Sequence, residues 1–216
     1  MIAPDYPAGD TNAELADGLA AILDRERIRQ VHVLGGSAGG LAAQSFVRHC
    51  PDRTASLILS HVPLLERESG KRLAKTLGWL RLMPQPILRA FFKRSMRGLQ
   101  PQADTPEIAL FKAHFLEIAN YKMTKAQIIS LMKRTVELTE TTFTPHDLED
   151  WPGRILLLMS EDDPATPEPA RQAMMAMYPQ AEAHLFSGGG HAASILKQDE
   201  YLDAIEQFIQ NNRPKS

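Results

Sequence analysis

The sequence has little cysteine, and its charges nearly balance. Its single cysteine, Cys50, excludes an internal disulfide and a cysteine-rich metal site. The 24 basic and 26 acidic residues leave a net charge of -2, so no global field draws the whole chain to nucleic acid or to an anionic membrane. The basic residues at positions 25–29 and 71–75 are interrupted by apolar or acidic residues. That pattern is typical of solvated helix faces.

The sequence also lacks long apolar runs. No segment approaches the roughly 20 apolar residues that span a bilayer. Residues 1–7 have neither the cationic nor the apolar region of a signal peptide. We therefore expect a cytoplasmic protein that has no membrane span and no nucleic-acid partner.

Short apolar runs alternate with helical periods in both terminal parts of the chain, which has 216 residues. This alternation predicts an α/β fold with a parallel sheet. The expected strands are residues 31–34, 55–59, 155–159 and 183–186, and the expected helices are residues 12–27, 41–49, 168–178 and 201–210.

The middle of the chain, residues 63–145, has no strand signal. It is expected to form several helices broken at prolines 84, 86, 101 and 106. Its apolar side chains fit both a helical core and a lid over a binding site. We therefore predict a core made of residues 1–62 and 146–216, with residues 63–145 as an inserted helical lid.

A G-x-S-x-G pattern occupies residues 35–39, Gly-Gly-Ser-Ala-Gly, between the strand that ends at Leu34 and the helix that follows. This context is that of a nucleophile elbow, a sharp turn that presents a serine at the carboxyl edge of a sheet. It makes Ser37 the candidate nucleophile. The alternative is a glycine-rich turn that only binds an anion at a helix N-terminus.

A serine nucleophile needs a histidine base and an acid that orients it, and both follow in the chain. His191 comes after three glycines behind the last expected strand, so it is the candidate base. Asp163, which follows the strong strand at 155–159, is the preferred acid, and Asp162 is the competing choice. His61 ends its own strand, where it could line the pocket.

Together these features resemble the α/β-hydrolase family, in which the order serine, acid, histidine recurs. The resemblance implies a three-layer sandwich with a mostly parallel sheet and a helical lid. Residues 3–9 are similar to the family's segment after its fourth strand. Within the family, the combination of these features with the Gly39-Gly40 pair resembles the maspardin-like branch.

The sequence departs from the family at its front. Three further strands and a His-Gly loop that donates to the oxyanion are expected before residue 3, but no His-Gly dipeptide occurs. We therefore expect an N-terminally truncated sheet, with the N–H of Ala38 as the remaining oxyanion donor. The uncovered edge of the strand at 31–34 predicts self-association.

The resemblance implies a serine hydrolase that acts on a small or apolar carboxylic ester through an acyl-enzyme on Ser37, without metal or organic cofactor. The missing oxyanion loop is expected to weaken its activity. Related hydrolytic, acyl-transfer and haloperoxidase chemistries of the fold stay open. The alternative is a non-catalytic interaction module, or an inactive fragment of a longer hydrolase.

Overall fold

The chain folds into two units, which we describe separately. The computed structural model describes residues 1–6, 9–65, 67–97, 104–141 and 143–211. One unit contains Met1–Gly18 and Leu65–Thr142, and the other contains Leu19–Leu64 and Phe143–Ser216. We call them the helical unit and the sheet unit. Helix α1 (Asn12–Arg25) begins in the first and ends in the second.

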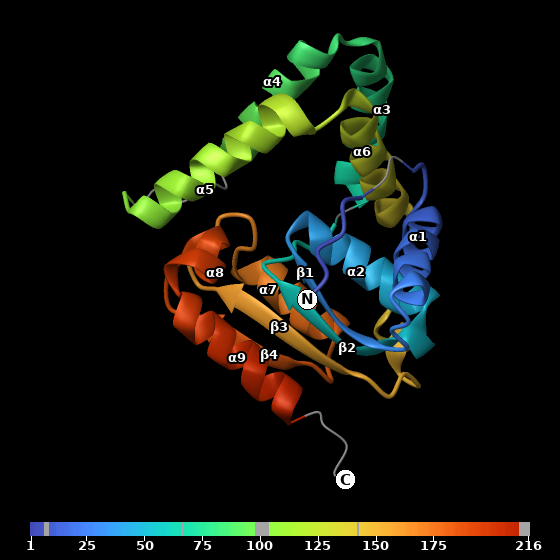
Figure 1. Ribbon diagram of the computed structural model, residues 1–216, viewed down its shortest axis with the longest axis vertical. Coiled ribbons are helices and arrows are strands. Elements are labelled where there is room, and N and C mark those ends of the chain that lie inside the picture. The colour runs from blue at the N-terminus through green and yellow to red at the C-terminus, as the bar shows by residue number, and fades with distance from the viewer. Residues whose placement is uncertain (7–8, 66, 98–103, 142, 212–216) are drawn as a thin grey trace. The chain divides into compact units, whose positions relative to one another are not determined.

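The sheet unit is built on four parallel strands in the order β1-β2-β3-β4 (Figure 1). They are β1 (Val31–Gly36), β2 (Thr54–Ser60), β3 (Arg154–Ser160) and β4 (Glu182–Phe186). Each contains one of the predicted strands, so the predicted parallel sheet is confirmed. The two central strands are almost entirely buried, which explains why their sequences are continuous apolar runs instead of alternating ones.

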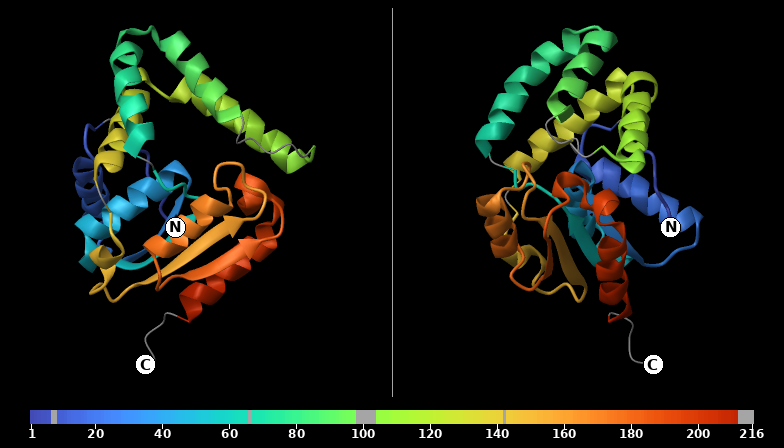
Figure 2. Two further views of the ribbon diagram at one scale, coloured as in Figure 1. Left: turned by 180° about the vertical axis from the view of Figure 1, so that it is seen from behind. Right: turned by 90° about the vertical axis from the view of Figure 1, so that its left-hand side faces the viewer.

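Helices cover both faces of this sheet. They are α2 (Ala38–His49), α7 (Glu168–Met177), the short α8 (Ala193–Leu196) and α9 (Gln198–Gln210), with 3-10 turns at Pro51–Arg53, Pro145–Leu148 and Gly190–Ala192. Figure 2 shows α7 and α9 on opposite sides of the strands. The predicted helices at 41–49, 168–178 and 201–210 are therefore confirmed, with boundaries that differ by one to three residues.

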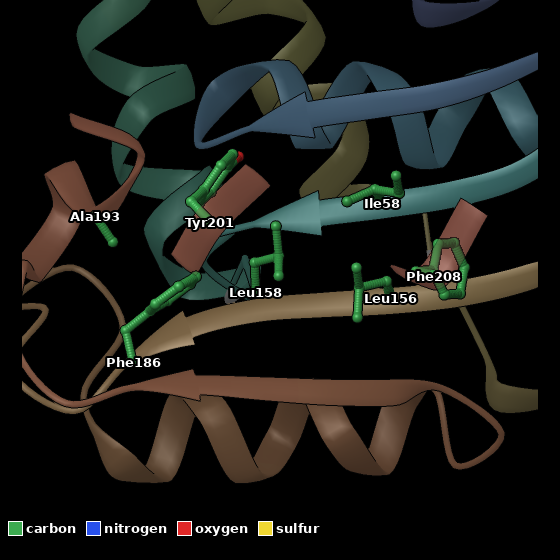
Figure 3. Close-up of a cluster of buried hydrophobic side chains, with 7 residues drawn as sticks. All are labelled: Ile58, Leu156, Leu158, Phe186, Ala193, Tyr201 and Phe208. Atoms are coloured by element: carbon green, nitrogen blue, oxygen red, sulfur yellow. The ribbon is translucent and has the colours of Figure 1, made fainter. Parts of the chain in front are cut away.

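Alternation along the strands assigns one apolar set to each face. Ile58 pairs in register with Leu156, and both belong to a buried cluster with Phe208 of α9 (Figure 3). On the opposite face Gly35 pairs with Leu59, and a Cβ on Gly35 would meet α2. Sheet and helices thus form the three layers of the predicted sandwich.

The helical unit contains the predicted helices between positions 63 and 145. They are α3 (Arg67–Leu82), α4 (Gln85–Met96), α5 (Pro106–Glu117), the π-helical turn η3 (Ile118–Lys122) and α6 (Lys125–Glu140). Pro84 is the N-cap of α4, Pro86 lies in its first turn, and Pro106 begins α5, positions where a missing N–H costs nothing. Pro101 lies outside the described residues.

Close packing joins α3 to α6. A Cβ on Gly70 would lie 1.7 Å from the hydroxyl oxygen of Thr139, so only glycine permits this approach. Leu80, Leu88 and Ile128 form the small apolar core of the unit.

The N-terminal segment is tied to α6 by buried polar groups. The side-chain amide of Asn12 donates to the carbonyl of Arg134 at 2.9 Å and to the Glu137 carboxylate at 2.8 Å. The backbone N–H of Gly9 donates to the Ser130 hydroxyl at 2.9 Å. Residues 1–18 therefore group with the helices. The division into a core of residues 1–62 and 146–216 and a lid of residues 63–145 stays a prediction. Residues 7 and 8 of the expected strand-exit segment lie outside the described residues.

Strand β1 is one edge of the sheet among the described residues, since it pairs only with β2. Leu34 on this strand is 48% exposed. An apolar edge of this kind favours pairing with another chain, and the expected self-association stays a prediction. Within the described part of the chain, no helix is long and apolar enough to cross a membrane.

Candidate active site

The candidate site lies at the carboxyl edge of the parallel sheet, entirely within the sheet unit. Ser37 follows β1, His61 follows β2, Asp163 follows β3, and His191 follows β4. Because parallel strands all end at the same edge, these four residues, far apart in the sequence, lie along one edge of the sheet.

Ser37 forms the turn between β1 and α2 with a strained backbone. Its φ is 49° and its ψ is -122°, a conformation that L-residues rarely adopt and that recurs at functional turns. The turn is held because the Ser37 N–H donates to the carbonyl of Ser60 at 2.9 Å. The geometry is that of the strand-turn-helix arrangement predicted from the sequence.

Two glycines make this sharp turn possible. A Cβ on Gly35 would lie 2.5 Å from the carbonyl oxygen of Gly39, and a Cβ on Gly40 would lie 2.0 Å from a methyl group of Val62. By contrast, a Cβ on Gly36 would meet nothing closer than 3.9 Å. Gly40, which lies outside the G-x-S-x-G pattern, therefore carries a packing requirement that Gly36 does not.

Asp163 and His191 form a hydrogen-bonded pair. The Asp163 carboxylate accepts from Nδ1 of His191 at 2.9 Å, and the two side chains are 0% and 11% exposed. The carboxylate also accepts from the Ala165 N–H at 2.8 Å and the Thr166 hydroxyl at 2.7 Å. A carboxylate bound to Nδ1–H leaves Nε2 of a neutral imidazole as a proton acceptor.

These hydrogen bonds keep Asp163 ionised. Burial alone would raise the pKa of its carboxyl, but the bonds from His191, Thr166 and Ala165 outweigh burial and hold that pKa below its usual value. A carboxylate that stays ionised at neutral pH is the acceptor that a histidine base requires of its partner.

Asp162 has a different neighbour. Its carboxylate accepts from the backbone N–H of Gly190 at 2.9 Å, so it fastens the loop that carries His191. That loop contains three consecutive glycines with positive φ, at 188, 189 and 190, which place the histidine on a 3-10 turn. The structure thus brings Asp163 to the imidazole and Asp162 to the loop backbone.

A second histidine contacts this pair, and the sequence indicated only that it could line a pocket. His61 is 3% exposed and has a φ of 52°. Its ring nitrogens hydrogen-bond the hydroxyls of Ser60 at 2.9 Å and Ser160 at 2.7 Å. Its ring lies edge-on to His191 with centroids 5.9 Å apart. Tyr201 extends this buried network through a hydrogen bond to Ser60.

Burial makes His61 a weak base. It lowers the pKa of His61 to about 4, and nearby His191 acts in the same direction, while Asp163 and Asp162 oppose it. His61 is therefore neutral at physiological pH. His191 accordingly has a buried, uncharged imidazole beside it.

Ala38, the predicted oxyanion donor, is the first residue of α2. First-turn N–H groups of a helix lack intrahelical partners, and the helix dipole favours negative charge there. Within the residues that the structure describes, no cluster of three or more histidine, cysteine, aspartate or glutamate side chains could hold a metal ion.

The comparisons with known proteins agree with this architecture. The model of the alpha/beta hydrolase family matches residues 2–204, so the chain belongs to the alpha/beta hydrolase family. The predicted family and fold are therefore confirmed.

Individual relatives are distant. The chain is 23% identical over 219 residues to RutD of Caulobacter vibrioides, covering 95% of this chain and 75% of RutD. It is 27% identical over 192 residues to human maspardin, covering 88% of this chain and 59% of maspardin. Among solved structures, an esterase from Thermogutta terrifontis has a TM-score of 0.68 at 19% identity, covering 99% of this chain and 76% of the esterase chain. Maspardin is thus one of several relatives of similar distance.

Proposed function

We propose that the protein is a serine hydrolase that cleaves a small or apolar carboxylic ester through an acyl-enzyme on Ser37. The observation that carries the proposal is the Asp163–His191 pair, with its 2.9 Å hydrogen bond, at the same sheet edge as the strained Ser37 turn. The esterase named above has a similar fold, which supports ester hydrolysis as the reaction class.

The proposed mechanism assigns one role to each side chain. Nε2 of His191 takes the proton of the Ser37 hydroxyl while the serine oxygen attacks the ester carbonyl. The N–H of Ala38 donates to the oxyanion that forms, and Asp163 stabilises the imidazolium. His191 then protonates the leaving alcohol, and a water molecule, activated by the same histidine, hydrolyses the acyl-enzyme.

Turnover of a chromogenic short-chain ester tests this assignment. Ser37→Ala is expected to remove nearly all turnover, because no other hydroxyl replaces the nucleophile. The matched control is Ser45→Ala, which removes a serine of α2, the helix that follows the elbow. This variant should retain activity. Equal turnover in both variants would contradict the nucleophile assignment. An inactive wild type would instead favour the non-catalytic alternative.

A further inference from the structure

Positive charge is concentrated on α3 and α4 of the helical unit. Residues 67–97 contain nine lysine or arginine residues and one glutamate, whereas the whole chain has a net charge of -2. The one carboxylate of this segment, Glu68, forms an ion pair with Lys71 at 2.5 Å, and Asp10 interacts electrostatically with Arg81 from outside the segment. The overall balance of charge therefore hides a strongly basic surface.

The exposed face of α3 combines these cations with large apolar side chains. Lys71, Lys75, Trp79 and Leu82 follow one another at spacings of four, four and three residues, which places them on one helix face. Trp79 is 73% and Leu82 78% exposed. The buried residues of α3 lie on its other face, which includes Leu80.

Helix α4 repeats the arrangement. Ile87, Phe91 and Arg94 share a face at spacings of four and three residues and are all exposed, the first two at 54% and 41%. The neighbouring Leu88 is fully buried in the core of the helical unit. Both helices thus present aliphatic or aromatic side chains among cations, although each already has a buried apolar face.

We propose that the exposed faces of α3 and α4 bind the surface of an anionic lipid bilayer. Amphipathic helices rich in Lys and Arg, with Trp, Phe and Leu beside them, lie in the bilayer interface, and tryptophan prefers the depth of the headgroups. The cations would contact lipid phosphates while Trp79, Leu82, Ile87 and Phe91 enter the interfacial region. This inference is independent of the role of Ser37.

The charge and the apolar groups together favour a bilayer over other occupants. A second copy of this surface would meet its own positive charge, which opposes self-association through these helices. A nucleic acid would satisfy the cations, but Leu82 and Ile87 would gain little from a phosphate backbone. An anionic bilayer offers negative charge and an apolar interior at the same surface.

Co-sedimentation of the full chain with vesicles tests the proposal. Vesicles of phosphatidylcholine with phosphatidylserine are expected to bind the protein, whereas pure phosphatidylcholine vesicles bind it much more weakly, and added salt weakens binding. Replacing the exposed cations Arg72, Lys75 and Arg94 by Gln should weaken binding about 100-fold, since each charge near the surface contributes about fivefold. The matched control is Leu110→Ser with Lys112→Gln on α5, where Leu110 is 72% exposed and Lys112 is the one lysine or arginine of the helix.

Tryptophan fluorescence tests whether the side chain of Trp79 contacts the bilayer. The sequence has two tryptophans, Trp79 and Trp151, and we expect the emission to shift to the blue when anionic vesicles are added. Trp79→Phe should abolish that shift. The proposal is wrong if binding does not depend on phosphatidylserine, if the charge variant binds like the control, or if Trp79→Phe keeps the shift. It is also wrong if a single-stranded oligonucleotide binds these residues more tightly than the vesicles do.

Discussion

The buried His61 makes the stability of the protein depend on pH in a way that can be calculated. Burial lowers its pKa from 6.5 to about 4, so the unfolded chain binds a proton in this range more readily than the folded one. Stability is therefore fully present above about pH 6.5 and is lost as the pH falls toward 4. The difference of about 2.5 between the pKa of His61 in the unfolded and the folded chain corresponds to roughly 3 kcal/mol of unfolding free energy.

A substitution isolates this contribution from those of the carboxylates. His61→Gln has no group that titrates between pH 4 and 7, yet its side chain can still hydrogen-bond Ser160. The free energy of unfolding of both proteins is measured by urea denaturation at several pH values in this range. The wild type should lose about 3 kcal/mol more than the variant between neutral pH and pH 4.

An exposed histidine provides the control. The His146 side chain is 83% exposed, so His146→Gln should leave the pH dependence of the wild type unchanged. Parallel stability curves for wild type and His61→Gln would refute the reasoning. They would mean that His61 is not buried in a neutral form.

Two further pairs of variants test the site and its support. Asp163→Asn should lower ester turnover roughly 10,000-fold, because the histidine loses its charged partner and its tautomer. Asp162→Asn should lower turnover less than about tenfold, since its amide oxygen can still accept the hydrogen bond from the loop. Steady-state kinetics that rank the two variants in reverse would assign the role of the acid to Asp162. Gly40→Ala should cost about 1 to 3 kcal/mol of unfolding free energy by overpacking against Val62, whereas Gly36→Ala should cost less than about 1 kcal/mol. Equal melting curves for these two glycine variants would contradict the packing argument.

The sheet and the elbow were predictable because local signals agree with tertiary structure there. The apolar runs at 55–59 and 155–159 are long and buried on both faces, and the glycine pattern sits between a strand and a helix. The sequence preferred Asp163 but could not exclude Asp162, since two adjacent carboxylates in one turn differ only in the direction in which their side chains point.

The network around His61 could not be predicted from spacing. Ser160, which hydrogen-bonds His61, comes from β3, and Tyr201, which hydrogen-bonds Ser60, comes from α9. The network therefore depends on the register of β2 against β3 and on the packing of α9. The packing requirement at Gly40 likewise depends on Val62, which follows another strand. The basic character of residues 67–97 was present in the sequence, but the near-zero net charge concealed it.

Covalent labelling with a fluorophosphonate tests the central claim most directly, because this reagent phosphonylates only a serine that has been activated. The full chain is incubated with the probe, digested, and the modified residue is mapped by mass spectrometry. We expect a single adduct on Ser37 that is lost in Ser37→Ala and much slower to form in His191→Ala. Labelling at another serine, or no labelling of a folded wild-type chain, would contradict the account.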